Sequence, residues 1–163
     1  MSDTNKADLI NMDLKTGRVV IRLRPDLAPL AAERIRTLSA EGFYDNTPFH
    51  RVIHGFMAQG GDPTGTGTSG SKLPDLKAEF TNKAKFERGT LGMARTMNPD
   101  SANSQFFIMF EPSPHLDGLY TIVGQVIEGM DHIDQIKRGA GHSGMVQEPD
   151  RIIKMRPADD AAA

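Results

Sequence analysis

Two short stretches near the start of the chain alternate between apolar and polar residues. Residues 9–14 alternate in part, and residues 18–23 resume the same period-two pattern, which is typical of strands with one buried face. Between them, residues 15–17 (Lys-Thr-Gly) have the composition of a tight turn. The pattern predicts a β-hairpin at the start of the fold.

A helix is predicted after the hairpin, over residues 29–41. Its apolar positions with helical spacing are Ala31, Ile35 and Leu38. Pro29 suits a first helical turn, and Gly42 suits the C-terminal end of a helix. A second, shorter helix is predicted over residues 130–136, where Met and Ile recur at helical spacing.

The remaining apolar stretches are too short for helices and are predicted to be strands. They cover residues 49–53, 56–59, 90–94, 105–110, 120–127 and 151–155. Residues 60–85 are rich in Gly, Thr, Ser and Lys and are predicted to form a long loop, and long loops in compact domains are often functional. Residues 157–163 are predicted to be a frayed tail.

Seven or eight short strands with two helices favour a mainly β fold, either a barrel or a sandwich with helical caps. A doubly wound parallel sheet would need regular alternation of strands and helices, and the pattern has none. The 163 residues, 38% of them hydrophobic, fit a single domain over 1–163. Its core is expected over about residues 8–156, with a frayed polar N-terminus and a frayed Ala-rich tail.

The charge balance gives no electrostatic reason to expect nucleic acid or a membrane as partner. Lys and Arg number 19 and Asp and Glu 21, for a formal net charge of −2, and the basic residues are dispersed. No stretch reaches the roughly 20 apolar residues of a membrane span. The chain begins with the polar MSDTNKADLI and contains no cysteine. We expect a cytoplasmic protein without disulfides, thiol nucleophiles or thiolate metal sites.

Residues 65–70 match the G-x-G-x-x-G pattern of dinucleotide-binding loops. Such a loop follows a strand and opens a helix, whereas Pro74, shortly after this stretch, disfavours the start of a helix. A flexible loop is the better interpretation, and we expect no cofactor.

His50 and His54 are four residues apart, a spacing that puts them on one face of a strand. The other histidines, His115, His132 and His142, lie in separate segments, so no third metal ligand is evident nearby. We expect no metal site, but a buried, hydrogen-bonded His50 and a loop-facing His54. The sequence also lacks the G-x-S-x-G elbow of many hydrolases, and nothing in it picks out a nucleophile with a base and an orienting group.

Arg51 is the least ordinary residue in the predicted strands. Strand alternation places Phe49, Arg51 and Ile53 on one face, with the residues between them on the other. The simpler interpretation is that Arg51 ends in water.

The residues around Arg51 in the sequence favour a binding role instead. They are Phe56, Met57, Gln59, Gln105, Phe106 and Phe107. An arginine among Phe and Met side chains, with two glutamines near, suits an apolar group that carries hydrogen-bond acceptors. Core packing is the alternative for Phe56, Met57 and Phe107.

Five stretches resemble the cyclophilin family. They are FYDNTPFHRVI at 43–53, GFMAQGGD at 55–62, GTLGMAR at 89–95, NSQFFI at 103–108 and LDG at 116–118. Their order and spacing extend the resemblance over residues 9–156, and as a set they are highly specific. The compact loop at 60–70 and the insert LPDLKAEF at 73–80 resemble the bacterial members.

The resemblance implies a closed eight-stranded antiparallel β-barrel with a helix over each end. It implies peptidyl-prolyl cis/trans isomerase activity, with proline-containing peptides and unfolded or partly folded proteins bound in a groove outside the barrel. By matching position, the implied catalytic residues are Arg51, Phe56 and Gln59. The residues implied to bind substrate are Met57, Ala94, Arg95, Gln105, Phe107, His115, Leu116 and Tyr120, with Gly65 and Thr66 in a neighbouring side pocket.

Two of these positions depart from the best-known eukaryotic members. His115 stands where many have tryptophan, which removes a large indole wall and its N–H donor and predicts weak binding of the cyclic peptide cyclosporin. Tyr120 stands where many have histidine and keeps a ring that can hydrogen-bond, so we expect the proline site to survive. For lack of an obvious assembly helix we expect a monomer.

Two other functions stay open at this point. One is a non-catalytic proline-peptide-binding or chaperone module on the same fold, although such a binder would not need to keep Arg51. The other is a β-barrel with a small ligand inside, although strands dense in Phe, Ile, Val and Met favour a filled interior.

Overall fold

The computed structural model describes residues 6–160, and its regular elements are eight strands and two α-helices, with two short 3-10 helices. The strands are β1 (Leu9–Leu14), β2 (Gly17–Leu23), β3 (Arg51–Ile53), β4 (Met57–Gly60), β5 (Thr90–Met93), β6 (Phe106–Met109), β7 (Ile122–Glu128) and β8 (Lys154–Pro157). The helices are α1 (Pro29–Ala40) and α2 (Met130–Asp134), with the 3-10 helices η1 (Lys6–Asp8) and η2 (Pro114–Leu116).

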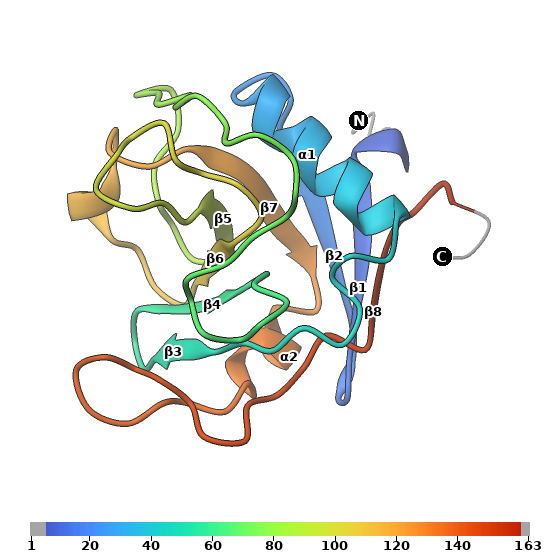
Figure 1. Cartoon of the computed structure of the whole chain (residues 1–163), viewed down its shortest axis with the longest axis vertical. Coiled ribbons are helices and arrows are strands. Elements are labelled where there is room, and N and C mark those ends of the chain that lie inside the picture. Colours follow the sequence, from blue (N-terminus) through green and yellow to red (C-terminus); the bar gives the residue numbers. More distant parts are fainter. Residues whose placement is uncertain (1–5, 161–163) are drawn as a thin grey trace.

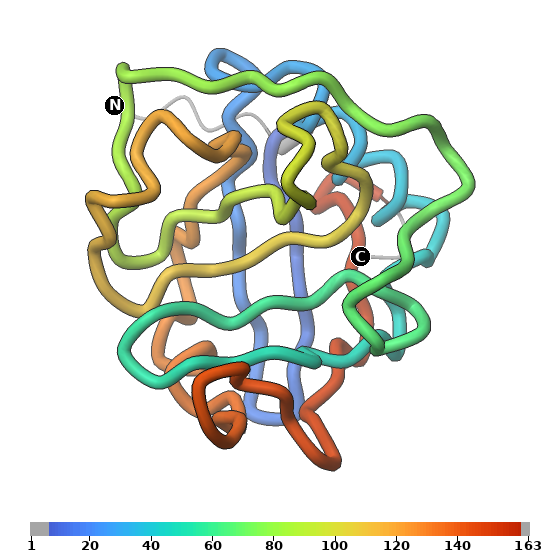
Figure 2. Tube along the Cα trace, turned by 60° about the vertical axis from the view of Figure 1, so that its left-hand side comes forward, coloured from blue at the N-terminus to red at the C-terminus, as the bar shows by residue number. Residues whose placement is uncertain are grey.

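All eight strands form one antiparallel sheet in the order β3-β4-β6-β5-β7-β2-β1-β8. The long hairpin β1–β2 lies beside the shorter strands in one view (Figure 1) and runs behind them in the turned view (Figure 2), which shows how far the sheet curls. Between the edge strands β3 and β8 the ladder is reduced to isolated bridges, Pro48 with Arg151 and Arg51 with Met145. The expected eight-stranded antiparallel barrel is thus confirmed, with this weak seam at its closure.

The first hairpin follows the alternation in the sequence. Leu14 pairs with Gly17 across the turn, and every second residue of β1 is buried. The buried side chains of the hairpin are Ile10, Met12, Leu14, Val19, Ile21 and Leu23. Because side chains of a strand alternate between its two faces, this pattern turns one face of the hairpin into the core.

The interior of the curled sheet is filled by side chains. Tyr44, Phe49 and Phe106 are fully buried there and meet edge to face, with ring centroids 5.4 Å apart for Tyr44–Phe106 and 6.4 Å for Phe49–Phe106. The Tyr44 hydroxyl donates to the Ser104 carbonyl at 2.8 Å, so its polar end is satisfied inside the core. This packing agrees with the expected filled interior and disfavours a ligand held inside the barrel.

The two helices cover opposite ends of the sheet (Figure 1). α1 begins at Pro29, as predicted, and ends one residue early, before Gly42, which has a φ of +76°. The Glu79 carboxylate accepts the N–H groups of Leu30 (3.1 Å) and Ala31 (2.9 Å), which fixes the loop before β5 to the start of α1. α2 is shorter than predicted, although Ile136 just beyond it is buried.

The last strand lies later than the sequence analysis placed it. It was predicted over 151–155, but β8 covers Lys154–Pro157. Pro157, expected to begin a frayed tail, is buried within β8, and the Ala158 N–H donates to the Leu9 carbonyl at 2.8 Å. Two hydrogen bonds from Arg36 to the Asp159 carboxylate, at 3.1 and 3.2 Å, hold the next turn. The rest of the expected fraying, at residues 1–5 and 161–163, lies outside the described residues.

Candidate active site

A groove on the outer surface of the sheet contains a cavity of about 340 Å³. Its walls are Arg51, Phe56, Met57, Gln59, Ala94, Arg95, Phe107, His115, Leu116 and Tyr120. Every one of these residues was named by the sequence analysis, although they come from β3, β4, β6, η2 and three connecting segments. We call this cavity the proline pocket.

The floor of the proline pocket is a cluster of rings separate from the main core. Phe107 is 5% exposed; it stacks on Phe86 with centroids 5.6 Å apart and meets Tyr120 edge-on at 5.6 Å. A Cβ on Gly92, across the ladder from Phe107, would overlap the Phe107 ring and come within 2.7 Å of Phe86 Cε1. The missing side chain of Gly92 therefore makes room for the floor.

Phe86 and Gly92 are contributors to the site that the sequence analysis did not identify. Gly92 lies inside a stretch that carried the family resemblance, and a glycine within a strand is a signal of close packing. Phe86 lies between the loop predicted over 60–85 and the strand predicted from residue 90, where nothing local shows that the residue is buried.

Arg51 lies at the start of β3, directly across the ladder from Gln59 of β4. Its Nε donates to the Ser143 carbonyl at 2.8 Å, and Nη1 donates to Gln59 Oε1 at 3.3 Å. The side chain is half-buried at the edge of the proline pocket. Phe49, predicted to share this face, is instead fully buried in the core, because β3 begins only at Arg51 and the strand alternation does not extend back to Phe49.

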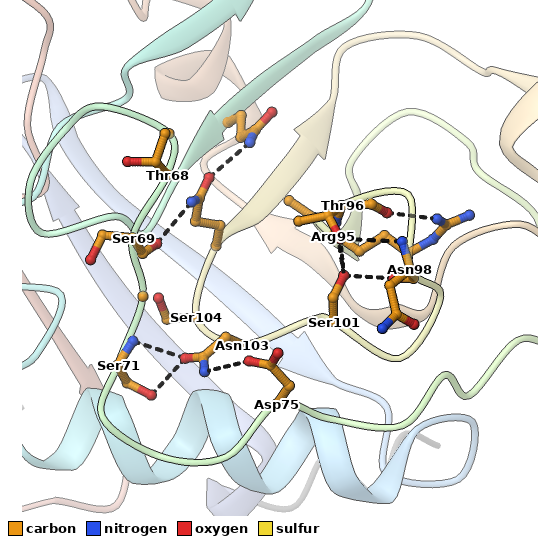
Figure 3. A pocket seen from close by; sticks show the side chains of 15 residues that line it. Thr68, Ser69, Ser71, Asp75, Arg95, Thr96, Asn98, Ser101, Asn103 and Ser104 are labelled. Atoms are coloured by element: carbon orange, nitrogen blue, oxygen red, sulfur yellow. Dashed lines mark hydrogen bonds between the residues drawn. The ribbon is translucent and has the colours of Figure 1, made fainter.

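Two glutamines continue the line of hydrogen bonds that begins at Arg51. Gln59 Nε2 donates to Gln105 Oε1 at 2.9 Å, and Gln105 Nε2 donates to the Ser69 carbonyl at 2.9 Å (the bond to Ser69 is dashed in Figure 3). Each amide therefore has its orientation set by the next group along the line. Gln59 borders both the proline pocket and a second cavity beyond it.

The second cavity, the side pocket, has a volume of about 610 Å³ and polar walls (Figure 3). Its residues are Gln59, Gly67, Thr68, Ser69, Gly70, Ser71, Asp75, Ala94, Arg95, Thr96, Asn98, Ser101, Asn103, Ser104 and Gln105. Gln105, implied by the resemblance to bind substrate, lines this side pocket and contacts the wall of the proline pocket through its hydrogen bond with Gln59. The resemblance had put Gly65 and Thr66 in this wall, but residues 67–71 of the same loop form it.

The displacement of Gly65 and Thr66 follows from how the loop folds around Asp62. The fully buried Asp62 carboxylate accepts the N–H groups of Thr64 (2.8 Å), Gly67 (2.7 Å) and Ser69 (3.2 Å). The Thr66 hydroxyl takes part in this cluster, 3.4 Å from Asp62 Oδ2, and Gly65 packs over the Pro48 ring. The loop therefore closes on a carboxylate and does not open a helix, as a dinucleotide-binding loop would.

The pKa of Asp62 reflects the same loop. Burial by itself would raise the pKa of this carboxyl, but hydrogen bonds from the Thr64 hydroxyl and from the amides of Thr64, Ser69 and Gly67 outweigh it and hold the pKa below its usual range. Asp62 is therefore a carboxylate at neutral pH, and its charge is one of the groups that hold the side-pocket loop together.

The outer rim of the proline pocket is formed by His115 and Tyr120, the two positions that depart from the eukaryotic pattern. The His115 ring lies 5.8 Å from the Phe56 ring, centroid to centroid, and its Nδ1 is 3.0 Å from the Ser113 hydroxyl. The Arg95 guanidinium carbon lies 4.6 Å above the Tyr120 ring, and the guanidinium donates twice to the Leu119 carbonyl, at 3.1 and 2.8 Å. Both departures thus keep a ring in the wall.

His50 and His54 differ in burial. His54 is exposed in the turn after β3, as expected. His50 is 2% exposed, which confirms the expected burial; its hydrogen bond with the Pro48 backbone is poorly aligned, and neither ring nitrogen has a well-aligned partner among residues 6–160. Burial disfavours the imidazolium and lowers the pKa of His50, which keeps the ring neutral at pH 7. Within residues 6–160, no three His, Cys, Asp or Glu side chains gather as metal ligands.

Comparison with known proteins shows the family to which the chain is similar. Residues 9–157 match the family described as "Cyclophilin type peptidyl-prolyl cis-trans isomerase/CLD". A "Probable peptidyl-prolyl cis-trans isomerase" of Brucella suis is 50% identical over 94% of this chain and 84% of its own length. "Peptidyl-prolyl cis-trans isomerase CYP18-1" of Arabidopsis thaliana is 41% identical over 79% of this chain and 82% of its own.

Solved structures give the same result. The cyclophilin AquaCyp293 from Hirschia baltica superposes with a TM-score of 0.86 at 27% identity and covers 97% of this chain and 77% of its own. A Cryptosporidium parvum cyclophilin-type isomerase, crystallised in the presence of the dipeptide Ala-Pro, has a TM-score of 0.85 at 32% identity over 91% of this chain and 98% of its own. The chain belongs to the cyclophilin-type peptidyl-prolyl cis-trans isomerases and catalyses rotation about the peptide bond that precedes proline.

Proposed function

We propose that Arg51 is the residue that lowers the barrier to rotation, while the proline pocket holds the ring of the substrate. The observation that carries this proposal is the position of the guanidinium. It lies at the edge of an apolar pocket, with Nε and Nη1 occupied by Ser143 and Gln59. Within residues 6–160, no group accepts a hydrogen bond from Nη2, so this nitrogen is free to donate to a substrate.

The chemistry of the bond explains why a donor is needed there. The barrier of about 20 kcal/mol arises from the amide resonance that is lost when the X–Pro bond twists. In the twisted state the prolyl nitrogen becomes pyramidal and regains its lone pair, so it accepts a hydrogen bond better than the planar amide does. A fixed donor at that nitrogen stabilises the transition state more than the ground state, which is the condition for catalysis.

Arginine suits this role because its guanidinium does not lose its proton in proteins and donates in a fixed plane. The Ser143 and Gln59 contacts hold that plane before substrate arrives, so less ordering is needed during the reaction. Lysine at position 51 would supply charge without the planar fork, and we expect Arg51→Lys to be impaired as well.

The apolar residues of the pocket hold the proline ring while the carbonyl of the preceding residue swings. Phe56, Met57, Phe107 and Leu116 form this surface. Gln59, Ala94 and Arg95 line the groove where the substrate backbone would pass, and the last two lie just beyond the end of β5 at Met93. No proton transfer or covalent intermediate is required, so a pocket and a donor suffice.

The family binds proline-containing peptides, and for this chain we propose unfolded or partly folded proteins as substrates, met as a monomer in the cytoplasm. A pocket that grips only the proline ring and the adjacent backbone places little demand on the rest of the chain. Weak binding of cyclosporin is part of the proposal, since the rim has the smaller His115 ring packed beside Phe56.

The test is the turnover of an Ala-Pro peptide by wild type and Arg51→Ala, measured by a protease-coupled assay and by NMR exchange. We expect turnover to fall by about 100-fold or more, as for loss of a donor that acts in a transition state. Circular dichroism and peptide titration should show that the fold and the binding of the peptide persist. Turnover near that of wild type in Arg51→Ala would refute the role of the arginine and favour a different mechanism in the same groove.

A further inference from the structure

Residues 139–146, between α2 and β8, lie outside the predicted site but run beside β3 (orange-red in Figures 1 and 2). The Gly139 N–H donates to the Val52 carbonyl at 2.8 Å, and the Val52 N–H donates to the Gly144 carbonyl at 2.8 Å. The Val146 N–H donates to the His50 carbonyl at 3.0 Å. We call this segment the clasp, because it pairs with the edge of β3 that no other strand covers.

The clasp also carries the acceptor for the Arg51 side chain. Val52 hydrogen-bonds to the backbone of the clasp. Arg51 Nε donates a hydrogen bond of 2.8 Å to the carbonyl of Ser143, the residue before Gly144. The second contact, Gln59 Oε1, is longer at 3.3 Å and comes from β4 on the other side of β3. The plane of the guanidinium is thus set from two sides, and the shorter hydrogen bond comes from the clasp.

Close packing against β3 places a requirement on Gly144. Its φ is +70°, and an added Cβ would lie 2.5 Å from Ile53 Cγ1 and 3.2 Å from the Val52 carbonyl oxygen. A Cβ on Gly139 would overlap the Gly144 carbonyl. A side chain at either position would therefore push the clasp off β3 and carry the Ser143 carbonyl away from Arg51.

We propose that the clasp is a positioning element for catalysis, in which Gly144 allows the Ser143 carbonyl to hold the Arg51 guanidinium in its productive plane. The inference rests on the proposed role of Arg51 and goes beyond it, because it assigns a function to a segment that does not line the proline pocket. The clasp acts through Arg51 and leaves the apolar grip on the proline ring alone. Its loss should therefore lower turnover without weakening peptide binding.

The chain offers a matched control in Gly141. Its φ of +67° is close to that of Gly144, but an added Cβ there would meet nothing within 4 Å. Gly141→Ala and Gly144→Ala therefore impose a similar backbone penalty on the same segment, and only Gly144→Ala forces the segment away from β3. A difference between the two variants reports on displacement of the clasp and not on a stiffer backbone.

The experiment measures cis/trans exchange of an Ala-Pro peptide by NMR at saturation, together with its Kd by titration. For Gly144→Ala we expect exchange to fall about 10- to 100-fold, the effect of misplacing a catalytic group by around 1 Å, with Kd within about two-fold of wild type. The Arg51 Nε–H signal should be protected from solvent exchange in wild type and in Gly141→Ala, and unprotected in Gly144→Ala.

Three results would overturn the inference. The first is normal peptide exchange in Gly144→Ala although Arg51 Nε–H has lost its protection. The second is an equal loss of turnover in Gly141→Ala and Gly144→Ala. The third is a fall in turnover of Gly144→Ala that is matched by a rise in its Kd for the peptide. If Gly144→Ala turns over normally while Arg51→Ala is inactive, the positioning role of the clasp is refuted and the proposed role of Arg51 stands. Normal turnover in Arg51→Ala refutes the proposed role of Arg51 itself.

A second variant keeps the test usable if Gly144→Ala does not fold. Ile53→Ala removes the Cγ1 atom that the new methyl would meet. Ile53→Ala/Gly144→Ala should fold, recover Arg51 Nε–H protection and turn over within about three-fold of Ile53→Ala, because the clasp can then return to β3. A folded double variant in which Nε–H is protected but turnover stays low would also contradict the inference.

Discussion

The proline pocket and the side pocket share Gln59, Ala94 and Arg95, yet they are built from different material. The proline pocket takes most of its walls from strands and η2, over stacked rings that are almost fully buried. The side pocket takes its walls from two loops, residues 67–75 and 94–105, that are rich in hydroxyls and amides. The two cavities are neighbours but depend on different forces.

Rings packed on a ladder have few alternative arrangements, because a close-packed cluster loses contacts whenever one member moves. Hydroxyl groups on loops can exchange one partner for another, or for water, at little net cost. We therefore expect the proline pocket to be preformed and intolerant of substitution. The side pocket should accept changes in its walls, as long as Asp62 keeps the loop closed.

The largest contrast is expected from truncating each wall. Phe107→Ala removes the ring between Phe86 and Tyr120 and with it about 2–3 kcal/mol of apolar contact to the proline ring, so kcat/KM should fall about 30- to 160-fold. Ser71→Ala in the side pocket should change kcat/KM for the same Ala-Pro peptide less than about three-fold, because its partly buried hydrogen bond to Asn103 lies away from the proline ring. Comparable losses in the protease-coupled assay would mean that both pockets depend on the same contacts.

Adding a methyl group to each pocket sharpens the comparison. Gly92→Ala would drive a Cβ into the Phe107 ring, and an overpacked site costs about 1–3 kcal/mol, which corresponds to about five-fold or more in kcat/KM. Gly70→Ala would bring a Cβ to 2.9 Å from Asn103 Oδ1, the end of a side chain that can shift. Its effect should stay below about three-fold. A Gly92→Ala variant with kcat/KM close to that of wild type would show that the ring cluster is looser than its packing indicates.

A change of pH should act on the side pocket through Asp62. Its folded-state pKa is below the unfolded value, so the carboxylate stabilises the fold above pH 4 and this contribution is lost as the pH falls through the folded pKa. Asp62→Asn should lower the free energy of unfolding by about 1–3 kcal/mol at pH 7, and the difference from wild type should shrink toward pH 3. Urea unfolding at both pH values tests this, and a constant difference would contradict it.

The smallest effect concerns the rim of the proline pocket. His115→Trp restores an indole wall beside Phe56, and we expect it to strengthen cyclosporin binding by about 10-fold through added apolar contact, about 1–2 kcal/mol. Turnover of the Ala-Pro peptide should change less than two-fold, since Arg51 and the ring floor are untouched. Calorimetric titration measures the first and the exchange assay the second. An unchanged cyclosporin affinity would mean that His115 does not limit it.

Much of the fold could be predicted because its signals are local. The alternation in residues 9–23 marks a hairpin whose buried residues the structure confirms, and the helix at 29–41 was placed within one residue. Errors arose where the local hydrophobic pattern continues beyond the residues that actually pair with a neighbouring strand. Strand alternation extended to Phe49 placed it beside Arg51, but β3 does not reach that far, and β8 was placed three residues too early at its start.

The site could be predicted where the residues of the family-like stretches also line the proline pocket. Arg51, Gln59 and Phe107 occur in stretches that resemble the family, and they meet in one cavity. The loop at 60–70 was less predictable, because its path depends on which amides the Asp62 carboxylate gathers, so the wall moved from Gly65 and Thr66 to the residues that follow.

The sequence by itself determined the class of protein, the apolar faces of its elements and most of the residues that line the proline pocket. These follow from periodicity and from a specific set of motifs, which are properties of neighbours along the chain. Only the tertiary structure decided that Phe86 supports the pocket floor, that Gly92 leaves room for it, and that the Ser143 carbonyl meets Arg51. Contacts between residues as far apart as Arg51 and Ser143 depend on how the sheet curls, and no local pattern in the chain records that curl.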